Sequence, residues 1–141
     1  MSIGSGAAVI AAADLAAASW LLDTGPDAFL ITQEQRIVHA NAAWTKLTGH
    51  RVEETVGKVI TDFTHLDDRA AIDEIRGLLA TIGEARSDHR IAAKDGRWLW
   101  VHVQARRGAS GAFLIVLHDI TAERTLNSDI RQLARSTALL R

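Results

Sequence analysis

The most constraining feature of the sequence is a nearly unbroken apolar run, Ala112 to Ile120, which passes directly into a helical pattern. The run follows a turn-like segment at 108–111 and has the length and composition of a strand buried on both faces. Beyond it, apolar residues recur every three or four positions, which places them on one stripe of a helix. The stripe consists of Leu126, Ile130, Leu133 and Leu140, with Thr137 filling the gap between the last two. We therefore predict that the last strand of a sheet continues into a C-terminal helix, with Asp119 and Thr121 at the junction.

The bulk composition limits the classes of protein that need to be considered. A length of 141 residues fits one domain with extra helices at its ends. The net charge of -1 gives no electrostatic reason to expect binding to nucleic acid. The absence of cysteine excludes disulfides, thiolate metal sites and cysteine nucleophiles, and it is consistent with the cytoplasm, where we expect the chain to be.

The alanine-rich stretch from Ala7 to Leu22 raises the question of a signal peptide or a membrane span. It lacks a basic region before it, and Asp14 interrupts it, so we expect no insertion into a membrane. Its larger apolar residues fall on one helical face, which predicts an amphipathic leading helix within residues 1–25 that ends at Gly25-Pro26. The three largest are Ile10, Trp20 and Leu21.

The remaining pattern predicts two strands, several helices and then three strands. The first two strands, 27–32 and 36–40, form an antiparallel hairpin, and Asn41 caps a helix over 42–48. A short helical turn over 52–56 and a longer helix from Asp67-Asp68 to about Ile82 follow. The last three strands are expected at 85–93, 97–106 and 112–120, with Asp95-Gly96 as a hairpin turn.

Five local motifs then occur in an informative order. They are Asp27-Ala28-Phe29-Leu30-Ile31, the segment from Ile37 to Trp44 with Leu47-Thr48-Gly49 after it, His65-Leu66-Asp67-Asp68-Arg69, Asp95-Gly96 followed by Trp100-Val101, and Asp119-Ile120-Thr121. In this order they resemble the PAS domain family, the sensory modules of bacterial signalling proteins, from about residue 27 to 124. The third motif departs from the family's His-Pro-Asp-Asp-Arg pattern by a leucine in place of proline.

The resemblance implies an α+β fold with a five-stranded antiparallel sheet and helices on one face. It further implies a PAS core over 26–121, flanked by the N-terminal helix at 1–25 and a coiled-coil-like signalling helix at 122–141. A PAS core commonly surrounds a pocket between the sheet and the helices. The candidate lining residues here are Trp44, Leu47, Phe63, Ile72, Ile75, Leu79, Val101, Val103, Ile115 and Leu117. Because this inner wall carries almost no polar group, the sequence favours an ordinary packed core over a ligand site.

The opposite face of the sheet is predicted to carry a large apolar patch. Strand alternation and the family's usual phase place Trp98, Trp100, Leu114 and Val116 there. A monomer rarely leaves such a patch in water, so we expect the leading helix to cover it, either in its own chain or across a homodimer. The C-terminal stripe of Leu126, Ile130, Leu133 and Leu140 spans only about two heptads, which is too short for a stable coiled coil alone, so we expect it to rely on the leading helix or on downstream sequence.

The resemblance also allows cofactors to be tested residue by residue. The light-sensing flavin branch forms its adduct with a cysteine, so that photochemistry is excluded here, although non-covalent flavin is not. The cysteine-and-tyrosine chromophore site of the yellow-protein branch is equally excluded, because tyrosine is absent too. Haem-binding members supply a histidine from the long helix, and none occurs from Leu66 to Ile82. His65, just before that helix, is expected to be solvated or to cap it.

No motif supports an independent enzyme or a metal site. His118-Asp119 matches a phosphohydrolase signature in two letters only, and no serine, histidine and acid set has a supporting motif. We expect a cytoplasmic sensory or relay module of a larger protein such as a sensor histidine kinase. In it Asp119 would bind a basic or amide partner, and Thr121 would cap the output helix. The alternative is a constitutive dimerisation module with a filled core and no small ligand.

Overall fold

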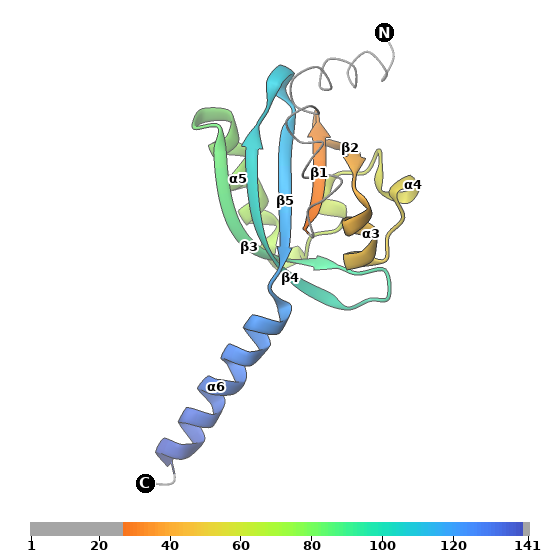
Figure 1. Cartoon of the computed structure of the whole chain (residues 1–141). Helices are drawn as coiled ribbons and strands as arrows, with labels where there is room; N and C mark the ends of the chain where they lie inside the picture. The colour runs from red at the N-terminus through yellow and green to blue at the C-terminus, as the bar shows by residue number, and fades with distance from the viewer. Residues whose placement is uncertain (1–26, 140–141) are drawn as a thin grey trace.

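A computed structural model describes residues 27–139 of the chain, with side chains to residue 137. The predicted leading helix, with Ile10, Trp20 and Leu21, and the last residue of the C-terminal stripe, Leu140, lie outside the described residues. The centre of the fold is an antiparallel sheet of five strands in the order β2-β1-β5-β4-β3, with helices across one face (Figure 1). The predicted α+β architecture is therefore confirmed.

The five strands lie within one or two residues of their predicted positions. They are β1 Ala28–Gln33, β2 Arg36–Ala40, β3 Glu84–Ala92, β4 Trp98–Arg107 and β5 Phe113–Asp119. The β1–β2 connection is a two-residue turn in which Glu34 and Gln35 have φ of 52° and 71°. Two consecutive residues with positive φ are typical of the tight hairpin turn that usually contains Asn-Gly.

The helices that cover the sheet begin and end at specific residues. They are α3 Ala42–Thr48, α4 Val52–Thr55 and α5 Arg69–Thr81, with single 3-10 turns at Ile60–Asp62 and Leu66–Asp68. Asn41 caps α3 as predicted, because its side-chain oxygen accepts the backbone N–H of Trp44 at 3.1 Å. Asp67 and Asp68 lie in the 3-10 turn just before α5 and not within its first turn.

The last strand passes almost directly into the last helix. Helix α6, Thr121–Leu139, starts two residues after β5 and extends away from the body of the domain (Figure 1). Since each residue adds about 1.5 Å to an α-helix, its 19 residues span about 28 Å. Its contacts with the rest of the described chain are made near its first turn, against β4.

The two faces of the sheet carry separate apolar clusters. The inner cluster lies between the sheet and the helices and contains, among others, Leu30, Trp44, Leu79, Val101 and Leu117, all at most 1 % exposed. The outer cluster is built around Phe29 and Ile31 of β1, and Leu114 and Val116 pack against it. The predicted phase of the last strands is therefore correct.

The prediction of one continuous outer patch was wrong. A polar row crosses the outer face between the two parts, because His102 lies opposite Asp88 on one side and His118 on the other. His102 contacts the Asp88 carboxylate at 2.6 Å, and His118 contacts that of Asp27 at 2.8 Å. Leu114 and Val116 thus lie on one side of the row, and Trp98 and Trp100 on the other.

Candidate functional site

A cavity of about 40 Å³ lies in the core between α5 and the sheet. It has apolar walls interrupted by a few polar side chains. Its lining residues are Thr32, Gln35, Ile60, Ile72, Ile75, Arg76, Leu79, His89, Val103, Ala105, Phe113, Ile115 and Leu117. A cavity of this size has room for about three water-sized groups.

Six of the ten predicted pocket residues line this cavity, namely Ile72, Ile75, Leu79, Val103, Ile115 and Leu117. The other four lie elsewhere in or beside the core. Trp44 and Val101 are completely buried, Phe63 packs edge-on against the Trp44 ring at 5.4 Å between centroids, and Leu47 is half-buried. These four residues are core and not cavity wall.

The expectation of an almost wholly apolar inner wall was also wrong. His89 of β3 faces the core, is only 2 % exposed, and its Nδ1 has no hydrogen-bond partner within the described part of the chain. Burial lowers the pKa of His89 below its ordinary value, so the ring is neutral near pH 7. Strand alternation along Ala85, Ser87 and His89 is the sequence signal that could have revealed this residue.

Three further polar residues at the cavity also escaped the sequence argument. Thr32 lies at the end of β1 and is 4 % exposed, Gln35 lies in the β1–β2 turn, and Arg76 projects from α5. Gln35 and Arg76 also line an exposed hollow beside Ser110 and Gly111. The cavity and this hollow therefore share part of their walls.

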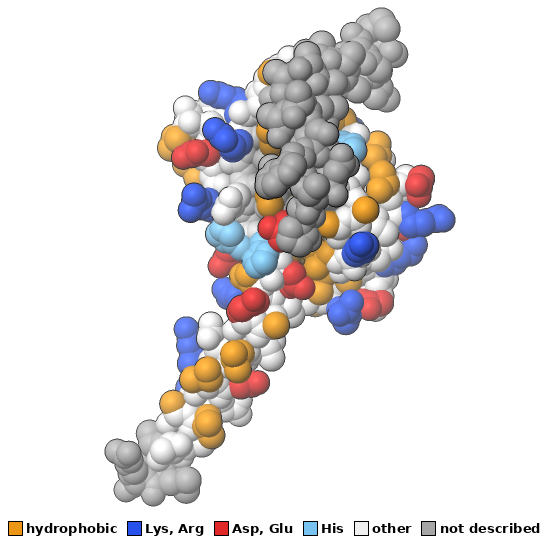
Figure 2. All heavy atoms as spheres, viewed as in Figure 1, with side chains coloured by type: hydrophobic (Ala, Val, Ile, Leu, Met, Phe, Trp, Pro, Cys, Tyr) orange, Lys and Arg blue, Asp and Glu red, His pale blue; other side chains and the backbone are white. Residues whose placement is uncertain are grey.

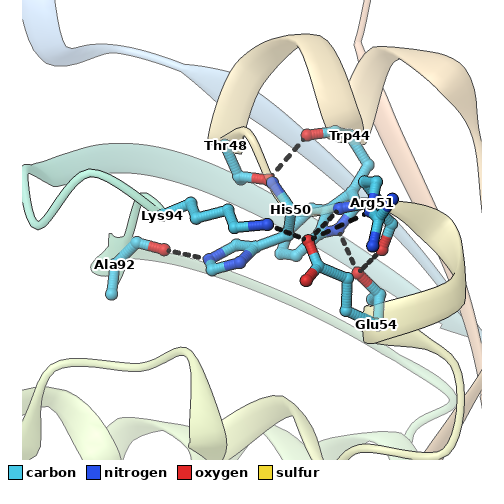
Figure 3. Close-up of polar contacts among 8 residues, drawn as sticks. Trp44, Thr48, His50, Arg51, Glu54, Ala92 and Lys94 are labelled. Atoms are coloured by element: carbon cyan, nitrogen blue, oxygen red, sulfur yellow. Dashed lines mark hydrogen bonds and ion pairs between the residues drawn. The ribbon is translucent and has the colours of Figure 1, made fainter.

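Helices α3 and α4 are fixed to the β3–β4 hairpin by a polar network (Figure 3). The His50 ring contacts the carbonyl of Ala92 at 2.9 Å, and the Lys94 ammonium donates to Glu54 at 2.7 Å. The pKa of Glu54 falls to about 2, chiefly because its carboxylate accepts the backbone N–H of Arg51 and then because of Lys94. These contacts hold α3 and α4 in place.

A second network lies at the edge strand β3 and joins it to the start of α5. The Asp68 carboxylate accepts three N–H groups of Arg90: the backbone N–H at 2.8 Å, Nε at 2.9 Å and a terminal guanidinium nitrogen at 2.8 Å. The hydrogen bonds from Arg90 lower the pKa of Asp68 to about 2. The Arg90 guanidinium also lies 5.0 Å from the centre of the Trp100 ring, so Trp100 of β4 is tied to the same network.

Trp100 is also where α6 is attached to the sheet. The Thr121 hydroxyl accepts the backbone N–H of Trp100 at 3.0 Å and donates to its carbonyl at 3.4 Å. The Arg124 guanidinium lies 3.7 Å from the centre of the Trp100 ring. Strand β4 therefore contacts the first turn of α6 through both its backbone and a side chain.

The predicted roles of the two junction residues need correction. The Thr121 hydroxyl binds strand β4 and does not cap α6. Asp119 accepts the backbone N–H of Thr121 at 2.9 Å, a local turn contact at the start of the helix, and not a bond from a basic side chain. His65 does cap a turn as expected, because its Nδ1 accepts the backbone N–H of Asp67 at 3.1 Å.

The described residues contain neither a metal-binding cluster nor a helix that could span a membrane. Within residues 27–139, no three histidine and acidic side chains lie close enough together to hold a metal ion. None of the helices in that range combines the length and hydrophobicity needed to cross a bilayer.

Comparison with known proteins identifies the family. The PAS domain family model matches residues 26–122, and the chain therefore belongs to the PAS domain family. A search of curated proteins found no match.

Similar solved structures agree with this fold. A PAS domain from Colwellia psychrerythraea is 22% identical, with a TM-score of 0.68, and the match covers 77% of this chain and 98% of that one. The ethanol complex of a PAS domain from a Burkholderia thailandensis LuxR-family regulator is 16% identical, with a TM-score of 0.63 and coverage of 72% and 96%. The LOV domain of a blue-light activated histidine kinase from Erythrobacter litoralis is 17% identical, with a TM-score of 0.61 and coverage of 68% and 97%.

Proposed function

We propose that this PAS domain is a cytoplasmic sensory and relay module of a larger signalling protein, a sensor histidine kinase. In this proposal, a ligand or a partner contact in the core changes the position of α6, which passes the change to an output domain. The observation that carries the proposal is the attachment of α6 to Trp100 through Thr121 and Arg124. The similar fold of a domain from a light-activated histidine kinase supports the choice of host.

The junction has the properties that a relay requires. Helix α6 makes few contacts with the body, so its orientation depends on a small number of bonds near its first turn. Trp100 also contacts Arg90, whose side chain is fixed by Asp68 at the start of α5. A shift of α5 relative to the sheet would therefore reach α6 through packed and hydrogen-bonded groups with no gap between them.

The relay can be tested in the parent protein by measuring output with and without its stimulus. Asp119→Ala removes the turn contact at the start of α6, and Thr121→Val removes both hydroxyl bonds to Trp100 while keeping the shape of the side chain. We expect both variants to reduce the response to the stimulus. Thr125→Val, an exposed change one turn further along α6, is the matched control. An unchanged response in both junction variants would refute the relay.

A constitutive dimerisation module with no small ligand is the second candidate. Its support is the apolar stripe on α6, where Leu126, Ile130 and Leu133 are 60%, 56% and 68% exposed. Figure 2 shows hydrophobic side chains gathered along this helix. A second copy of α6 would bury this stripe in a parallel or antiparallel pair.

Native mass spectrometry of the purified protein separates the two candidates. Extra mass on each chain would establish a bound molecule and support sensing. A dimer with no extra mass would support dimerisation, and a charged substitution on the stripe, Ile130→Glu, should then convert it to a monomer. Persistence of the dimer in Ile130→Glu would show that α6 is not its interface.

A further inference from the structure

The core cavity is lined by polar side chains from strands that lie far apart in the sheet. Gln35 follows β1, whereas His89 lies on the edge strand β3. Strands β5 and β4 separate these two strands in the sheet order. Three steps between neighbouring strands amount to about 14 Å. The cavity is therefore lined by four adjacent strands, and a molecule that contacts both Gln35 or its neighbours and His89 must be extended.

The end near the β1–β2 turn is the accessible one. Gln35, Arg76 and Phe113 line both the cavity and the exposed hollow beside the β1–β2 turn, so the cavity and the hollow share a wall at this end. Among the described residues that line the cavity, Arg76 is the only one with a permanent charge. Its sole described ion pair is a 3.4 Å contact with Asp73, whose side chain is 75% exposed. Such a contact is weak, so the guanidinium can exchange it for the carboxylate of a ligand.

The opposite end presents a neutral hydrogen-bonding group. His89 is 2% exposed, and its Nδ1 has no partner in the described part of the chain. A buried polar atom with no partner is unfavourable, and a bound hydroxyl or carbonyl group would relieve that cost. Thr32, 4 % exposed, adds a second polar side chain to the wall.

The wall between the ends is aliphatic. It includes Ile72, Ile75 and Leu79 on α5, opposite Ile115 and Leu117 on β5. A volume of about 40 Å³ admits a chain of about three or four methylene groups and excludes a flavin, a haem or a nucleotide in this state of the core.

We propose that this cavity binds a short linear carboxylic acid that carries a hydroxyl or carbonyl group at its far end. The carboxylate binds Arg76, the aliphatic chain lies between α5 and the sheet, and the far polar group bonds to His89. The inference rests on the proposed function, because such an acid would be the signal that α6 relays.

Calorimetric titration of the whole chain with matched ligands tests this assignment. The probes are ω-hydroxy acids of four and five carbons and the unsubstituted acids of the same length, which differ by a single hydroxyl group. We expect the best hydroxy acid to bind about tenfold more tightly than its unsubstituted counterpart, the size of effect that one hydrogen bond to a buried group produces. No saturable binding by any member of the series would overturn the proposal.

Three variants assign the contacts. Arg76→Gln should weaken both ligands of a pair by about tenfold or more, because it removes the charge at the open end. His89→Leu should abolish the preference for the hydroxy acid while leaving the unsubstituted acid bound. Arg86→Gln, which removes an exposed arginine of β3 outside the cavity, should change neither. A hydroxyl preference that survives in His89→Leu, or unchanged affinity in Arg76→Gln, would contradict the assignment.

The two proposals fail in distinguishable ways. If none of these acids binds but the junction variants still silence the parent protein, the ligand class is wrong and the relay stands. If the acids bind as expected but Asp119→Ala and Thr121→Val leave output unchanged, the site is correct and the relay is wrong.

Discussion

Replacing His89 with leucine is expected to stabilise the fold, although most core substitutions destabilise. The native ring buries an Nδ1 atom that has no partner in the described chain. Leaving such an atom unpaired costs about 1–3 kcal/mol. Leucine has a similar volume and no polar atom, so the free energy of unfolding should rise by about that amount at pH 7.5. This is a large change, because whole domains are stable by only about 5–15 kcal/mol.

The gain from His89→Leu should increase as the pH falls. Burial lowers the folded-state pKa of His89, so below pH 6.5 the unfolded chain takes up a proton that the folded chain excludes. In the wild-type protein, titration of His89 therefore costs no stability above pH 6.5, and it lowers the free energy of unfolding as the pH falls below that value. The slope for one group is at most about 1.4 kcal/mol per pH unit. The variant has no histidine at position 89 and therefore lacks this loss of stability at low pH.

Urea unfolding followed by tryptophan fluorescence, at pH 7.5 and pH 5.5, measures both effects. The difference between variant and wild type cancels the other titrating groups, which are present in both proteins. We expect a higher midpoint for His89→Leu at pH 7.5, an unchanged dependence on urea concentration, and a larger difference at pH 5.5. A variant that is less stable at both pH values, or a difference that does not depend on pH, would refute the argument that His89 is buried, neutral and unpaired.

Three other variants have effects that follow from the structure. Asn41→Ala should lower the free energy of unfolding in urea by about 2–4 kcal/mol, because the Asn41 side-chain oxygen accepts the buried backbone N–H groups of Phe29, at 2.9 Å, and Trp44, at 3.1 Å. A loss below about 1 kcal/mol would mean that water replaces the Asn41 side chain. The double change Glu34→Asn and Gln35→Gly should raise the melting temperature, because both positions have positive φ; the gain in the free energy of unfolding should be about 1 kcal/mol. A lower melting temperature would show that this turn conformation is not kept. The hydrogen bond to Asp27 raises the pKa of His118, so the stabilisation from this pair is present below pH 6.5 and is lost as the pH rises through the folded-state pKa. His118→Asn should therefore lower the free energy of unfolding more at pH 5.5 than at pH 8.5. The reverse order would contradict the pairing.

The secondary structure was predictable because its signals are local. Asn41 precedes a helical pattern, Asp95-Gly96 separates two strand patterns, and the apolar run from Ala112 changes period after Thr121. Each signal depends on residues only a few positions apart, and each strand and helix predicted within residues 27–139 is present within one or two residues of its predicted place. The order of these elements, together with the five motifs, was sufficient to predict the fold.

The candidate site was less predictable because its geometry depends on register between strands. The sequence does not show that His102 lies opposite both Asp88 and His118, so the polar row that divides the outer face was missed. Strand β3 alternates weakly, since small and polar residues fall on both of its faces, and this concealed His89. Thr121 has the composition of a helix cap, and only the position of β4 shows that its hydroxyl binds Trp100.

A side-chain route through β3 and β4 joins the cavity to the junction. His89 and Arg90 are consecutive on β3, so alternation directs one side chain into the cavity and the other to the outer face. Arg90 is fixed by Asp68 and contacts Trp100, which lies opposite it on β4. An occupant that shifts the β3 backbone at His89 therefore also shifts Arg90, and the ring and backbone of Trp100 extend the effect to the first turn of α6. Strand β5 is covalently continuous with α6, but its core residues cannot be changed without destabilising the fold. Substitutions of Arg90 and Trp100, near the edge of the sheet, should therefore uncouple the cavity from the helix without unfolding the core.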